Sequence, residues 1–135
     1  MSKKLFSIND LNATSAADEP IVMPWVNEAT GEETGIEILV LSEESTKFKE
    51  FVRKSINARR SKEFIQAKTG KQEVETYEQT EDNINKAVAA RIVGWNGIEE
   101  EFTPELALQL VSKNESLQRQ VLAASSKPVD FLKNK

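Results

Sequence analysis

The sequence predicts a helix-dominated α+β domain: an N-terminal β-hairpin, an antiparallel helical hairpin and two shorter C-terminal helices. Two short runs of aliphatic and β-branched residues flank a polar loop with two glycines, which is typical of a hairpin. Two long stretches then show helical spacing. Capping signals precede the second of these helices and the shorter helix that follows it. A chain of 135 residues suits one domain, here residues 20–132, between an N-terminal arm (1–19) and a short tail (133–135).

The predicted hairpin joins residues 21–26 to residues 36–41. Pro24 cannot donate to a ladder, so the first run is expected at a sheet edge. The second run is almost continuously apolar and is expected to be covered on both faces. A lone two-stranded hairpin is barely stable in water, so it must pack on helices or pair with another chain. We therefore expect Trp25, Leu39 and Leu41 to contribute to a contact with a partner or a second copy.

The first long helix is expected to open at Ser42 and to stop at Gly70. Thr76 and Gln79 have the spacing of a capping box, so a second helix should begin near Tyr77. The short connection between the two helices predicts an antiparallel pair. The apolar positions expected to form one face on each helix are Phe48, Phe51, Val52, Ile56, Phe64 and Ile65 on the first, and Tyr77, Ile84, Val88, Ile92 and Trp95 on the second.

The second helix is expected to break at the segment 94–98, where Gly94 or Gly97 can adopt the left-handed backbone. Thr103 can cap a third helix whose first position is Pro104. A fourth helix follows and is expected to end before Pro128. Trp95 is expected to anchor the packing of these helices, with an interface contact as the alternative; Ile98 and Phe102, which flank the loop, are further candidates for partner contact.

Composition excludes several classes of function. The sequence contains neither histidine nor cysteine, which removes disulfides, thiolate zinc sites and the Ser-His-Asp and Cys-His catalytic arrangements. No remaining group of residues matches a catalytic motif, so we expect no enzyme activity and no cofactor. The three successive carboxylates at 99–101 point in different directions and favour a solvated loop over a metal site. No secretory signal or membrane-spanning run is evident, which predicts a soluble cytoplasmic protein without a membrane partner.

Charge is arranged in blocks within a net charge of −4. Arg53, Lys54, Arg59, Arg60 and Lys62 form a basic run on the first long helix. In an antiparallel pair these residues should lie opposite Glu78, Glu81 and Asp82, so ion pairing between helices is the favoured interpretation. A docking surface for an acidic partner is the first alternative. Nucleic-acid binding is disfavoured because no interleaved aromatics or recognition fold accompany the run.

Several motifs follow one another along the chain: the loop 30–36 between two apolar runs before a basic helix, the glycine-flanked Trp95 segment, the helix start 102–105, and the closing stretches 117–121 and 130–132. Their order resembles that in the tail assembly chaperones of long-tailed bacteriophages. Together these motifs span about residues 20–132.

The resemblance implies a protein of the bacterial host cytoplasm that binds the tape measure protein, helps recruit tail tube subunits and is absent from the finished virion. A homo-oligomer is expected, since a long apolar helical client needs many copies of an adaptable surface. The alternative is a structural component of the virion, in the tail or the head, which would use the hairpin to add strands between subunits. The arm 1–19 is either a disordered terminus or a segment that orders on a partner.

Overall fold

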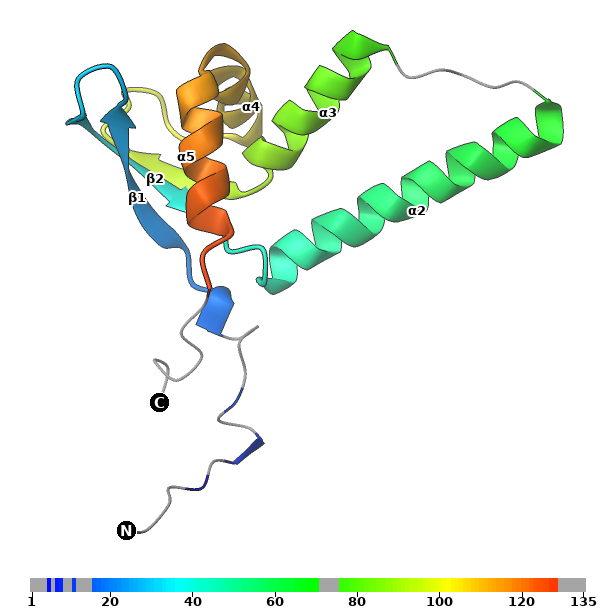
Figure 1. The fold of residues 1–135 in the computed structure, drawn as a ribbon, viewed down its shortest axis with the longest axis horizontal. Coiled ribbons are helices and arrows are strands. Elements are labelled where there is room, and N and C mark those ends of the chain that lie inside the picture. The colour runs from blue at the N-terminus through cyan, green and yellow to red at the C-terminus, as the bar shows by residue number, and fades with distance from the viewer. Residues whose placement is uncertain (1–4, 6, 9–10, 12–15, 71–75, 129–135) are drawn as a thin grey trace.

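The computed structural model describes residues 5, 7–8, 11, 16–70 and 76–128, and it confirms the helix-dominated α+β class (Figure 1). The hairpin strands are β1 (Ile21–Asn27) and β2 (Glu32–Val40). They are followed by α2 (Thr46–Thr69), α3 (Tyr77–Ala89), β3 (Ile92–Asn96), α4 (Pro104–Lys113) and α5 (Glu115–Ser125).

The antiparallel sheet has the order β1-β2-β3, so the predicted hairpin is confirmed but acquires a third strand. Ile38 in β2 lies between Met23 of β1 and Trp95 of β3, and all three side chains share one face. Because β2 is central, its backbone is paired on both sides. The apolar second run is therefore covered as predicted, but it offers no edge to a second copy.

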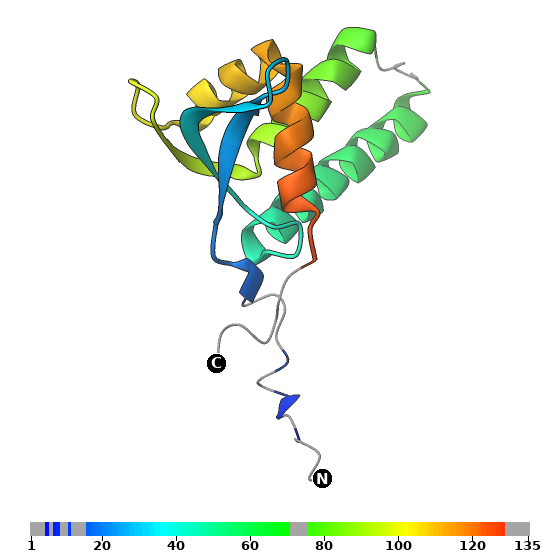
Figure 2. The same cartoon turned by 60° about the vertical axis from the view of Figure 1, so that its left-hand side comes forward.

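The core lies between one face of this sheet and three helices, α3, α4 and α5 (Figures 1 and 2). Residues 0–1% exposed define its centre: Ile38, Val40, Val88, Ala107, Val111, Leu117 and Val121. Burial of aliphatic side chains of this size contributes about 1.5–3 kcal/mol each. The short helices α4 and α5 form as predicted, and they are separated by the single residue Asn114.

The segment 92–96 is a strand, so the prediction that the second helix continues through Ile92 to Trp95 is wrong. α3 ends at Ala89, and β3 begins two residues after the cap. Gly94 lies opposite Leu39, where an added Cβ would come within 2.9 Å of the leucine Cδ1. The helical spacing of the apolar residues was outweighed by a pairing with a strand more than 50 residues earlier, which local periodicity cannot show.

α2 extends from the body, and of its side chains only Phe48 is buried (Figure 1). It begins one turn later than predicted, because Ser45 rather than Ser42 accepts the hydrogen bond from the backbone N–H of Phe48. Gly70 ends it at φ 70°, as predicted. Phe64 lies roughly 160° around the axis from Phe48, so the six apolar residues do not form one face.

α2 and α3 do not form the packed antiparallel pair that the sequence predicts. No extensive backbone contact joins them over the described residues, and apart from the buried Phe48 and Val88 most of their large apolar side chains remain exposed. Asp82 pairs with Lys86 of its own helix at 2.9 Å rather than with the basic run. The capping box of Thr76 and Gln79 is nevertheless present, with hydrogen bonds of 3.1 and 2.9 Å.

The domain begins earlier than residue 20. Ala17 is 2% exposed, and the Asp18 carboxylate accepts hydrogen bonds from the backbone N–H (2.7 Å) and the hydroxyl (3.1 Å) of Thr46. Asp18 thus caps the start of α2, where a negative charge is favourable. The predicted tail (133–135) and the family-like stretch 130–132 lie outside the described residues.

Candidate functional site

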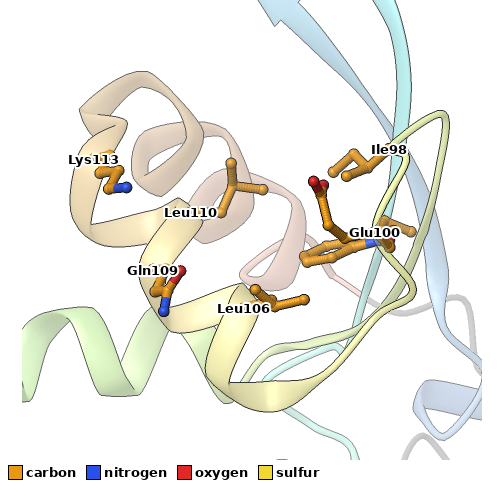
Figure 3. Close-up of a pocket in the computed structure, with 7 residues that line it drawn as sticks. Ile98, Glu100, Leu106, Gln109, Leu110 and Lys113 are labelled. Atoms are coloured by element: carbon orange, nitrogen blue, oxygen red, sulfur yellow. The ribbon is translucent and has the colours of Figure 1, made fainter.

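A hollow of about 250 Å³ lies between β3, the following loop and α4 (Figure 3). It is smaller than the roughly 300–1,000 Å³ of pockets that hold drug-sized ligands, and its size suits one or two side chains. Its walls are mainly apolar. The lining residues are Trp95, Ile98, Glu100, Leu106, Gln109, Leu110 and Lys113.

Trp95 organises this hollow. Its indole Nε1 donates to the backbone carbonyl of Glu100 at 2.9 Å, which folds the loop back onto the strand. The Phe102 ring meets the indole edge-on, at 5.1 Å between centroids and 83° between planes. Gly97 makes the turn possible: its φ is 87°, and an added Cβ would lie 2.8 Å from the Gly35 carbonyl oxygen. The structure therefore brings together three predicted contact residues, Trp95, Ile98 and Phe102.

The loop and helix start that border the hollow are rich in glutamate. Glu100 lines it, and the neighbouring Glu99, Glu101 and Glu105 are exposed. Lys113 lines the hollow as well, from the end of α4. We call this region, the hollow with these four glutamates, the acidic hollow. A cationic group carried by an apolar or aromatic partner side chain suits it best.

The exposed length of α2 is a second candidate surface, and it has two different sides. Val52 and Ile56, 37% and 45% exposed, lie one turn apart. Further along, Arg60, Phe64 and Lys68 continue the same four-residue spacing, and because the row turns by about 40° at each step, Phe64 lies about 100° around the axis from the midpoint of Val52 and Ile56. The Phe64 side chain is 64% exposed, and the Lys68 Nζ lies 5.2 Å from its ring centroid. We call Arg60, Phe64 and Lys68 the basic face.

Arg91, which the sequence analysis did not single out, fastens the start of α2 to the body. Its Nε donates to the Ser125 hydroxyl (3.2 Å), its Nη1 to the Ala87 carbonyl (2.7 Å) and its Nη2 to Glu43 (3.1 Å). The guanidinium also lies 4.3 Å from the centroid of the Phe48 ring. An arginine inside an apolar stretch, between Ala90 and Ile92, was the available signal, because a buried charge requires partners.

The other three predicted contact residues lie elsewhere. Leu41 is 4% exposed beside this arginine, so it cannot reach a partner and the prediction for it is wrong. Leu39 is partly covered and lies over Gly94 on the sheet face away from the core. Trp25 is half-buried against the core, and its Nε1 donates to the Ser116 hydroxyl at 3.4 Å.

The Gln120 side chain hydrogen-bonds to backbone groups on the outer edge of β1. Its amide accepts from the backbone N–H of Val26 (2.9 Å) and donates to the Val26 carbonyl (2.8 Å), as a neighbouring strand would. Next to it, Arg119 of α5 pairs with Glu28, and this hydrogen bond holds the pKa of the Glu28 carboxyl below its usual value. No strand lies beyond β3 in the described part of the chain, so β3 has the more open edge.

Three further observations bear on the class of site. Within residues 16–70 and 76–128, no three acidic side chains converge in a way that could hold a metal ion. No helix among the described residues is both long and apolar enough to cross a membrane. Comparison of the chain with protein-family models, curated proteins and solved structures gave no match.

Proposed function

We propose that this protein is a tail assembly chaperone of a long-tailed bacteriophage, acting in the cytoplasm of the bacterial host. It would bind the tape measure protein, keep it soluble and help recruit tail tube subunits, without remaining in the virion. The order of sequence motifs supports this proposal. The observation that carries it in the structure is α2, a helix of 24 residues that exposes apolar side chains along its length.

The surface suits an extended helical client. A helix of this length measures about 36 Å, and it presents Val52 and Ile56 one turn apart. Ile84 and Tyr77 of the next helix are 50% and 81% exposed. Amphipathic helices are recognised by such rows of apolar side chains, and repeated weak contacts on many copies add up along a long client.

Co-expression with the tape measure protein tests the proposal. Wild-type protein should raise the soluble yield of the tape measure protein and co-purify with it. The double variant Val52→Gln/Ile56→Gln should lose both effects while remaining folded, because neither residue is buried. A control, Val22→Thr/Leu122→Gln, changes apolar residues of similar exposure on β1 and α5 and should behave as wild type. No gain in soluble yield with wild-type protein would refute the chaperone proposal.

The second candidate is a structural component of the virion, and the open edge of β3 favours it. Strand addition to such an edge is a common way to join subunits. Purified particles distinguish the two functions, since only a structural component remains in them. Detection of the chain by mass spectrometry at a stoichiometric level would support the virion component and contradict the chaperone.

A further inference from the structure

The basic face of α2 and the acidic hollow are complementary in charge. α2 contains eight Lys/Arg and two Asp/Glu, a net charge of +6 in a chain whose total is −4, so the remainder carries −10. The segment that borders the hollow has the same sign of charge: Glu100 and Lys113 line the hollow, and Glu99, Glu101 and Glu105 are exposed close by in the sequence. We infer that copies of this chain associate head to tail, with the basic face of one copy bound in the acidic hollow of the next.

The apolar parts of the two surfaces also fit. The Phe64 side chain is 64% exposed between two cations, and among the large hydrophobic side chains of residues 16–70 and 76–128 only Tyr77 is more exposed. The hollow is open, walled by the Trp95 indole and two leucines, and of a size for a single large side chain. An aromatic ring inserted there would leave Arg60 and Lys68, one turn to either side, beside the glutamates. Aromatic and arginine anchors in small pockets are typical centres of protein interfaces.

The contact must form between copies. The end of α2 and the loop that bears the acidic hollow lie on opposite sides of the molecule in both views (Figures 1 and 2). A single copy therefore presents one surface of each kind, pointing away from one another. An interface between two different surfaces is heterologous, and it produces a ring or an open chain rather than a closed dimer.

A second copy is favoured over another acidic partner because both halves of the contact are present on the same chain. This inference does not depend on the proposed function. The tape measure protein would use Val52 and Ile56, whose midpoint lies about 100° around the α2 axis from Phe64, so substitutions at 52 and 56 test client binding while those at 60 and 68 test self-association.

Sedimentation velocity at low and high salt tests the inference, with circular dichroism to confirm folding. Wild-type protein should sediment as species larger than the 15.2 kDa monomer, and shift toward monomer as salt rises. Arg60→Glu/Lys68→Glu and Glu100→Lys/Glu101→Lys should each weaken association by about tenfold or more, because like charges would then face each other. Two controls reverse equal charge elsewhere and should associate as wild type: Lys54→Glu/Arg59→Glu, and Glu32→Lys/Glu33→Lys.

Mixing the two weakened variants gives the sharpest result. Each retains one intact surface of opposite kind, and the two reversed surfaces are again opposite in charge, so together they should form longer species in which the two variants alternate. Combining all four substitutions in one chain should restore longer species, with the charges exchanged. If wild-type protein is a monomer at about 100 μM in low salt, its affinity for itself is too weak for the proposed contact. That result would overturn the inference. So would a mixture that contains only monomers, or controls that dissociate as the test variants do.

Discussion

At the scale of single residues, Arg91 determines how α2 leaves the body. The Arg91 side chain is 10% exposed, and its guanidinium links the end of α3, the end of α5 and the residues before α2. Its backbone takes part as well, since the Arg91 carbonyl accepts from Leu41 N–H at 2.6 Å and the Ser125 hydroxyl donates to the Leu41 carbonyl at 2.7 Å. One side chain thus sets the relative position of three helices.

Replacement of Arg91 by methionine should destabilise the fold by about 2–4 kcal/mol, since it leaves Glu43 and the Ala87 carbonyl without their buried partner. Methionine keeps most of the apolar stem, so the loss reports the charge and its hydrogen bonds. Chemical denaturation measures the change. Arg59→Met, at an exposed position on α2, should change stability by less than about 0.5 kcal/mol. Equal effects of the two variants would contradict the role assigned to Arg91.

Trp95 should matter less for stability than a fully buried tryptophan. Its side chain is half-buried, so Trp95→Ala should cost about 2–3 kcal/mol, below the 3–5 kcal/mol typical of deletion of a buried aromatic. The loss comes from the Phe102 contact and the hydrogen bond to Glu100. Thermal denaturation measures it, with Trp25→Ala for comparison. An unchanged melting temperature would show that the loop does not depend on the indole.

The residues that the sequence could identify are those whose roles are local. Thr76, Thr103 and Gly70 act within a few positions of themselves, and each has the predicted capping role. Trp95 and Ile98 line the hollow, and that a partner contacts them stays a prediction. Arg91 and Gln120 were not found, because their partners lie 34–94 positions away along the chain.

At the scale of elements, β3 shows what local patterns miss. The segment 92–96 satisfies helical spacing with Val88 and also the β propensity of Ile and Val, so sequence alone leaves both states open. Pairing with β2 selects the strand, and β2 is in place to pair only because it is part of the β1–β2 hairpin. The fold class was predictable despite this error, since one short strand does not change the balance of helix and sheet.

The two sheet edges differ, and Gln120 accounts for the protection of β1. Gln120→Ala would leave the Val26 N–H and carbonyl without their protein partner and should cost about 1–2 kcal/mol. It should also raise the tendency to aggregate, because an open strand edge is a template for other chains. Denaturation and light scattering measure the two effects. The control Gln109→Ala, exposed on α4, should be close to neutral for stability, and an equal loss there would contradict this account.

At the scale of the whole molecule, the chain divides its surface between a compact acidic body and a basic helix that extends from it. The sequence favoured pairing of that basic charge with the neighbouring helix, and it placed the contact between copies on the hairpin. The structure instead leaves the basic face exposed and places β2 inside the sheet. The predicted ion pairing with α3 is therefore not formed by Asp82, and the alternative of a docking surface for an acidic partner stays a prediction.

The central claim is that α2 is the surface that partners bind, and hydrogen–deuterium exchange tests it most directly. In dilute protein at moderate salt, amides of residues 51–69 should exchange well before those of β2 and α5, because they belong to a helix without a covering partner. Addition of the tape measure protein should slow exchange in that segment by more than in any other described element. Exchange in α2 that is already as slow as in β2, or that does not change when the tape measure protein binds, would contradict the claim.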